Sequence, residues 1–140
     1  MINAQAGTFS LVLAPQSVTA GATATANIDT LGSDYATLVL SRNKITHTNA
    51  NNLTVSLSQS DDTNASNFAT VVSNITLSSQ SSAVYAYHVD LRGKKRYLRL
   101  SQTPGTATTD AMTVSAIAYL TRKEQAPGTT TQMADAGQII

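Results

Sequence analysis

The sequence contains no cysteine, and this absence excludes several kinds of chemistry at once. Disulfide bonds, thiolate metal sites and a cysteine nucleophile are all ruled out, so packing or assembly must stabilise the fold. Tryptophan is also absent, and aromatic residues make up only 5% of the chain. Sugar-binding β-sandwiches usually present an exposed aromatic platform, so this composition disfavours a carbohydrate-binding function.

Charge is equally scarce. Charged residues make up 12% of the chain, against about 25% in an average protein, and the net charge is +1. General binding to nucleic acid or to an anionic membrane needs a broad basic surface, which this composition does not supply. No apolar run approaches the roughly 18 residues that span a bilayer, and the first ten residues do not resemble a secretory signal. We therefore expect a soluble protein, made inside a cell, with no nucleic-acid or membrane partner.

Hydroxyl side chains are abundant: the 140 residues include 21 threonines and 15 serines. This composition is typical of many short strands with polar outer faces, because surface helices would use Glu, Lys and Gln instead. We predict an all-β fold consisting of a single antiparallel β-sandwich, jelly-roll-like, with roughly eight strands. The sandwich is expected over residues 8–124, between an N-terminal arm (1–7) and a C-terminal tail (125–140).

Apolar and polar residues alternate in several runs along the predicted sandwich. The alternation is most regular in residues 53–58, and residues 35–41 show a second run with one apolar face. Residues 9–13 predict a first strand that ends at Pro15, since proline cannot donate to a sheet ladder. Residues 68–77 form either one bulged strand or two short strands.

The last predicted strand runs from Met112 to Leu120, and its second face is half apolar because it carries Ile117 and Tyr119. Such a face is expected to be covered by a neighbouring subunit or by a tail. The tail finishes with Ile139 and Ile140, which are either part of a loose end or dock onto an adjacent molecule. These four residues predict a symmetric homo-oligomer such as a trimer.

Residues 83–100 carry most of the positive charge and show the pattern of a β-hairpin. An even-numbered loop would place Val89 opposite Leu98, with Gly93 at the first central position of a type II′ turn. Five of the nine basic residues lie here: Arg92, Lys94, Lys95, Arg96 and Arg99. They are either a solvated tip that discourages edge aggregation or a patch that binds an acidic partner surface.

Enumeration of reactive side chains gives no catalytic motif. Neither His47 nor His88 stands in a nucleophile or metalloprotease motif, so each is expected to be a satisfied surface histidine, and we expect no enzyme activity. Residues 59–67 are too polar to bury and should form a surface loop. This loop begins like a calcium-binding loop, but glycine is missing at the sixth position and Ser73 replaces the bidentate glutamate. No cofactor or metal is expected, although a calcium site of another pattern stays open.

Four successive parts of the chain together resemble a known group of proteins. The stretch LTVSLSQSDDTNASNFATVV (residues 53–72), the strand RYLRL (residues 96–100), a threonine-rich loop and a long strand together resemble small β-sandwich virion proteins of tailed bacteriophages. The resemblance covers residues 53–122. It implies a capsid decoration (cement) protein that binds the major capsid protein on the virion surface after synthesis in the host cytoplasm. The alternative is a carbohydrate- or receptor-binding module of a phage tail.

Overall fold

Strands account for nearly all regular structure in the computed structural model, which describes residues 7–43, 53–77, 83–105, 111–122 and 136–139. No α-helix occurs within these residues. The elements are β1 (Gly7–Val18), β2 (Ala24–Asp29), β3 (Tyr35–Arg42), β4 (Leu53–Ser60), a short 3-10 helix η2 (Ala65–Asn67), β5 (Ala69–Leu77), β6 (Ala83–Asp90), β7 (Tyr97–Pro104), β8 (Met112–Thr121) and β9 (Ala136–Ile139).

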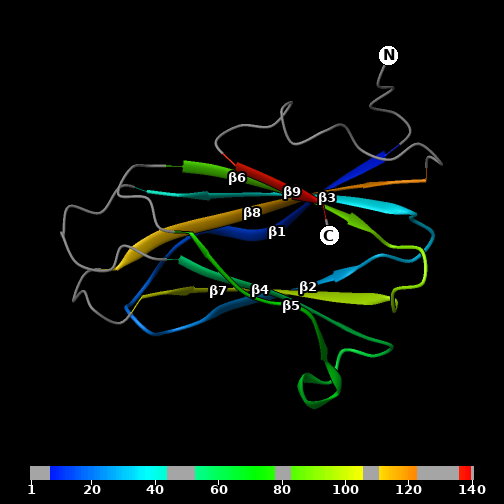
Figure 1. The fold of residues 1–140 in the computed structure, drawn as a ribbon, viewed down its shortest axis with the longest axis horizontal. Coiled ribbons are helices and arrows are strands. Elements are labelled where there is room, and N and C mark those ends of the chain that lie inside the picture. The colour runs from blue at the N-terminus through cyan, green and yellow to red at the C-terminus, as the bar shows by residue number, and fades with distance from the viewer. Residues whose placement is uncertain (1–6, 44–52, 78–82, 106–110, 123–135, 140) are drawn as a thin grey trace.

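The strands form two sheets that face each other (Figure 1). One sheet has the order β1-β8-β3-β6-β9 and the other the order β2-β7-β4-β5. Alternate residues of both sheets point inward and build one continuous core between the layers. Leu38, Leu40, Leu53, Leu98 and Leu100 are among its fully buried members.

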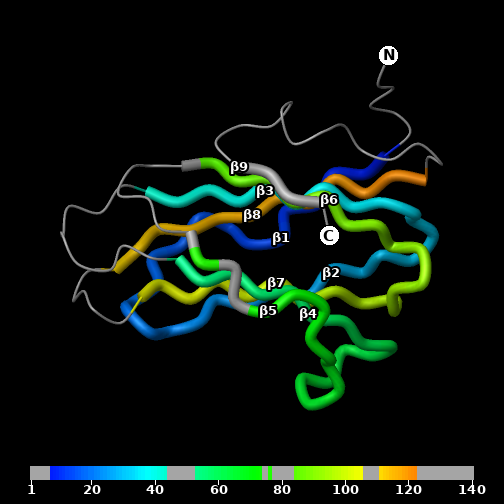
Figure 2. Tube along the Cα trace, viewed as in Figure 1, coloured from blue at the N-terminus to red at the C-terminus, as the bar shows by residue number. Residues whose placement is uncertain are grey.

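The pairing of strands is nested. β1 pairs with β8, β2 with β7, β3 with β6 and β4 with β5, and all four pairs are antiparallel. This arrangement is a long two-stranded ribbon whose successive pairs lie in alternate sheets, as the chain trace in Figure 2 shows. It is the topology of a jelly roll, so the predicted fold class is confirmed.

Two strands have the inward faces that their alternation predicts. Ala36, Leu38 and Leu40 of β3 are at most 1% exposed, because they face the opposite sheet. The apolar residues of β4 are buried in the same way, and β5 is one strand with two register irregularities against β4. Each of these strands has one face towards solvent and one face towards the core. In such a strand the alternation of polar and apolar residues shows which side chains are buried.

The predicted hairpin over residues 83–100 is wrong. β6 and β7 belong to different sheets, so Val89 lies opposite Ala36 and Leu98 lies opposite Ile28. A strand buries every second residue when its partner lies beside it in the same sheet. It buries the same residues when the partner lies across the core in the other sheet. Alternation alone therefore cannot distinguish a hairpin from a connection between sheets.

β1 continues past Pro15 to Val18, so the predicted end of this strand is also wrong. The strand lies at the edge of its sheet, where proline costs no ladder hydrogen bond. Register irregularities fall between Leu11 and Leu13 and again before Gln16. Such bulges reverse the direction of the following side chains. As a result Leu13 is buried, whereas Leu11 points away from the core.

Candidate functional site

Four of the nine Lys and Arg residues gather at one corner of the sandwich, where residues 91–96 cross from β6 to β7. The backbone N–H of Lys94 donates to the carbonyl of Leu91 at 2.9 Å and closes a tight turn. Gly93 has a φ of 80°, a conformation that favours glycine. The predicted positive φ is thus confirmed, but Gly93 is the third residue of this turn and not the first central residue of a type II′ turn.

Three of the five basic residues form ion pairs with carboxylates of the same chain. Arg92 pairs with Asp90 through two hydrogen bonds of 3.0 and 2.7 Å. Arg96 pairs with Asp29 in the same bidentate way, through hydrogen bonds of 3.0 and 2.7 Å. The hydrogen bonds from Arg92 lower the pKa of Asp90 to about 2, and those from Arg96 lower the pKa of Asp29. The charge of this corner is therefore largely balanced within the molecule.

Arg99 lies on β7 and holds a neighbouring loop in place. Its guanidinium lies 3.8 Å from the centre of the Phe68 ring. It also donates to the side chain of Asn27 at 2.9 Å and to the carbonyl of Ala65 at 3.3 Å. Lys94 and Arg99 are the two of the five basic residues that make no ion pair with the described residues, and both are partly buried.

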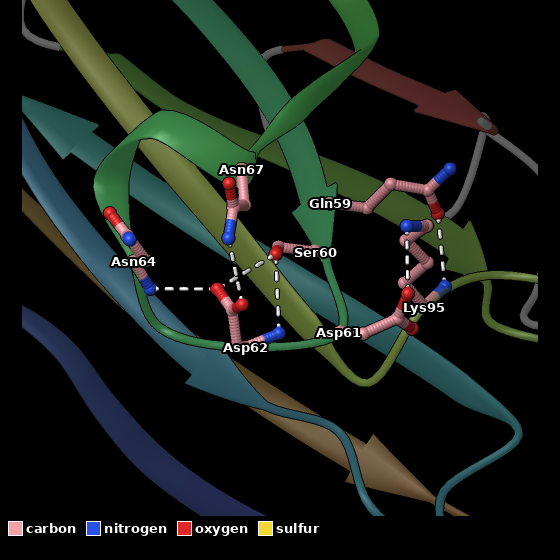
Figure 3. A network of polar contacts seen from close by, with 7 residues as sticks. All are labelled: Gln59, Ser60, Asp61, Asp62, Asn64, Asn67 and Lys95. Carbon is pink, nitrogen blue, oxygen red and sulfur yellow. Dashed lines mark hydrogen bonds and ion pairs between the residues drawn. The ribbon is translucent and has the colours of Figure 1, made fainter.

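The polar loop after β4 is organised by Asp62 (Figure 3). One carboxylate oxygen accepts the backbone N–H of Asn64 at 2.9 Å, and the other accepts the side-chain amide of Asn67 at 2.8 Å. These bonds, with that from Asn67 the strongest influence, lower the pKa of Asp62. Residues 61–67 are all exposed, which confirms the predicted surface loop over these residues. The prediction is wrong for residues 59 and 60, which belong to β4, and Ser60 is buried.

This carboxylate is occupied by donors of its own chain, so its geometry is that of a loop anchor. Within the part of the chain that the structure describes, no group of three or more His, Cys, Asp or Glu side chains could hold a metal ion. Figure 3 also shows how the loop meets the basic corner: Lys95 pairs with Asp61 at 2.7 Å, and its backbone N–H donates to Gln59 at 3.0 Å. The loop and the corner form one connected polar rim.

The outer face of the five-stranded sheet is apolar over three adjacent strands. Phe9 lies opposite Tyr119, and Ile117 lies between Leu11 on one side and Val39 on the other. The exposed fractions are 67% for Phe9, 64% for Leu11, 45% for Ile117 and 36% for Val39. We refer to these five residues as the outer apolar face. Large exposed apolar side chains that are grouped in this way mark interaction surfaces.

The two aromatic members of the outer apolar face are in contact. The ring centres of Phe9 and Tyr119 are 4.4 Å apart with an angle of 31° between the ring planes. Gly7 makes room for this arrangement, because a Cβ atom at that position would lie 2.5 Å from the Tyr119 ring. The aromatic pair is therefore held against the start of β1 without a partner molecule.

The sequence identified only part of this face. Ile117 and Tyr119 were predicted as contacts and lie on it, whereas Phe9, Leu11 and Val39 were missed. Phe9 and Leu11 looked like core residues of a regular strand, and only the bulge after Leu11 turns them outward. The other predicted contacts lie elsewhere: Ile139 is in β9, and Ile140 and the arm before Gly7 are outside the described residues.

The histidines differ from their predicted setting. His88 is buried with 8% exposure, so the prediction of a surface residue is wrong. Its Nδ1 lies 2.8 Å from the hydroxyl of Thr37, and burial lowers the pKa of the imidazole. Its hydrogen-bonding capacity at Nδ1 is satisfied by this neighbour on β3. His47 lies outside the described residues.

A pocket of about 580 Å³ opens at the end of the sandwich near the basic corner. Its wall combines apolar side chains with hydroxyl and charged groups: Gly7, Thr8, Asp29, Leu31, Ser33, Leu120 and Arg122. Gly32 has a φ of 75°, and a Cβ atom there would lie 2.7 Å from the guanidinium of Arg122. The turn between β2 and β3 therefore allows Arg122 to lie close against the backbone.

Taken together, these features define a jelly-roll β-sandwich with an outer apolar face and an internally balanced basic corner. No helix among the described residues is long and apolar enough to cross a membrane. No protein-family model matches the sequence, and no curated protein matches it. Similarity is found only at the level of solved structures.

Three of the solved structures that are similar to this chain come from different sources. The enzymatically active domain of tailspike protein 4 from bacteriophage CBA120 has a TM-score of 0.50 and 14% identity, covering 84% of this chain and 20% of that chain. A protein of the IBDV viral particle has a TM-score of 0.48 and 12% identity, covering 87% and 33%. A protein of the pili that form Bacillus endospore appendages has a TM-score of 0.49 and 11% identity, covering 83% and 88%.

The chain thus spans a fifth of the tailspike chain and a third of the viral-particle chain. At 14% identity or less, the likeness concerns the fold alone. The tailspike domain, with its TM-score of 0.50, shares the β-sandwich fold with this protein.

Proposed function

We propose that this protein is a non-enzymatic structural component of a virion, a decoration or cement protein that binds the capsid exterior and bridges neighbouring major capsid subunits. The observation that carries the proposal is the outer apolar face on a jelly-roll sandwich. Phe9 and Leu11 are each about two thirds exposed, on a sheet that is otherwise regularly paired. A stable monomer rarely exposes such a group of side chains.

The fold and the charge distribution support this role. Jelly rolls recur in viral capsid proteins. The ion pairs of Arg92 and Arg96 leave little charge for a polyanionic partner. Association through apolar area is therefore favoured over association through charge, and salt should weaken it little.

Within this role the surfaces divide their tasks. The outer apolar face joins copies of the chain into a trimer or another symmetric homo-oligomer. The arm before Gly7 and the tail after residue 124 supply most of the affinity for the major capsid protein. The basic corner orients the oligomer on an acidic capsid surface.

Particles made with and without the gene for this protein test the proposal. Wild-type particles should carry the protein on their outer surface in a cryo-electron microscopy map, and particles without it should break at a lower temperature. A variant with Phe9→Ser and Leu11→Ser should show reduced occupancy, whereas Leu31→Ser, which changes an equally exposed residue elsewhere, should not. Location of the protein inside the shell, or unchanged occupancy of the double variant, would contradict the proposal.

Carbohydrate binding is the second candidate, and one observation favours it. The Phe9 and Tyr119 rings lie beside the pocket that Gly7, Thr8 and Arg122 help to line, so an aromatic surface and polar groups stand close together. Titration with a panel of bacterial surface glycans would detect it. Binding that Tyr119→Ala and Arg122→Ala both abolish would favour this function over the structural one.

A further inference from the structure

Strand β6 has the character of an interior strand, although only a short strand covers its far edge. One edge is paired with β3 and the other with β9. The five residues from Tyr85 to Val89 are all at most 8% exposed, so both faces of the strand are buried. Edge strands are normally protected by lysine, proline or a bulge, and residues 83–89 contain none of these. The far edge of β6 is therefore built to receive another strand.

The strand that occupies this edge differs from all others described. β9 has four residues and runs parallel to β6, from Tyr85 opposite Ala136 to His88 opposite Ile139. Every other described pairing is antiparallel. A parallel pair within one chain needs a crossover connection that returns along the sheet.

The connection to β9 is longer than this return requires. β8 ends at Thr121, level with Asp90, whereas β9 starts level with Tyr85, three strand positions away. The return is about 17 Å along the strands and about 14 Å across them, or about 22 Å in a straight line. The 14 intervening residues can extend over about 46–50 Å. This is roughly twice the distance within one copy, so the length of the connection does not tie β9 to the β6 of its own copy.

We propose that the edge of β6 receives β9 from a second copy of this chain, so that neighbouring copies are joined by exchanged strands. The backbone hydrogen bonds are the same within one copy and between two, so exchange loses no bond and is favoured as the local concentration of copies rises. Reciprocal exchange between two copies gives a symmetric dimer, and one-way exchange gives a head-to-tail contact that forms a ring where the rotation closes. The exchange would add a second contact between copies to the one that the proposed function assigns to the outer apolar face, and it does not depend on a virion location.

The absence of cysteine allows a direct test with introduced thiols. Ala86 lies opposite Gly137 in the parallel register, so Ala86→Cys and Gly137→Cys place thiols on the acceptor and the donor. The two single variants of the full chain, one carrying a mass tag, are mixed and oxidised mildly. We expect a mixed disulfide dimer in at least tenfold greater yield than from Ala86→Cys mixed with Thr113→Cys, whose thiol lies on β8.

The double variant supplies the opposite outcome. If it forms only an internal disulfide at monomer mass, and the mixed single variants give no more dimer than the control, β9 belongs to its own copy and the proposal is overturned. A second pair, His88→Cys with Ile139→Cys, gives the same two outcomes if circular dichroism shows that Ala86→Cys does not fold. The measurement uses isolated protein, so its failure is distinct from absence of the protein on particles.

Discussion

Removal of the exposed aromatic and aliphatic groups at the start of β1 should separate assembly from folding. Phe9 and Leu11 are 67% and 64% exposed, so Phe9→Ser with Leu11→Ser removes little that the single copy has buried. The largest loss within one copy is the contact of Phe9 with Tyr119, and aromatic pairs contribute about 0.5–1.5 kcal/mol. The free energy of unfolding should therefore fall by about 1 kcal/mol.

The effect on association should be larger. Complete burial of a Phe or Leu side chain contributes about 1.5–3 kcal/mol, and two thirds of that gain is still available to an interface at each position, about 1–2 kcal/mol. The two substitutions together should weaken association by about 2–4 kcal/mol, which is roughly 30-fold to 1,000-fold in the dissociation constant.

Sedimentation equilibrium over a range of concentrations measures the dissociation constant, and urea unfolding measures stability. Leu31→Ser is the matched control, because Leu31 is 69% exposed but lies in the turn after β2. The reasoning would be refuted by wild-type association of the double variant, or by equal weakening in the Leu31→Ser control.

Three further predictions concern the single copy. Gln102 is fully buried and its amide has no hydrogen-bond partner among the described residues, so Gln102→Met should raise the free energy of unfolding in urea by about 1–2 kcal/mol. Burial raises the pKa of Tyr87 to about 12 from 10.0, so stability should fall as the pH rises from 10.0 towards 12, and Tyr87→Phe should remove that fall in alkaline melting curves. Arg92 lowers the pKa of Asp90 to about 2, so its contribution is present above pH 3.8 and is lost as the pH falls towards 2; acid titration of Asp90→Asn should lack this step.

The sequence was most informative where a strand has one dry and one wet face. Residues 35–41 and 53–58 obey this rule, and both strands were predicted together with the faces that they bury. The jelly-roll class followed from the number and spacing of such strands. The order of the strands could not be predicted in this way. The pattern of burial shows which side of a strand faces the core, but it does not show which strand pairs with it.

The errors share that physical origin. Val89 and Leu98 are both buried, and the sequence cannot show that they belong to opposite sheets. Phe9 and Leu11 keep the alternation of Leu13, and the bulge that turns them outward depends on pairing with β8, a hundred residues later. The basic residues were found, but their partners Asp29 and Asp61 lie too far away in the sequence for pattern reasoning to connect them.

The nested pairing also determines when this chain can fold during its synthesis. Of the four nested pairs, only β4 and β5 are neighbours in the sequence, so a nascent chain can close that pair first. The pairs β3 with β6, β2 with β7 and β1 with β8 can then be added from the inside outward. Gly7 can therefore pair with Thr121 only after Thr121 has left the ribosome. The apolar strand β1 stays unpaired for most of translation. Folding dominated by such distant pairings is slow and exposed to aggregation, so the yield of soluble protein should rise when translation is slowed or a chaperone is supplied.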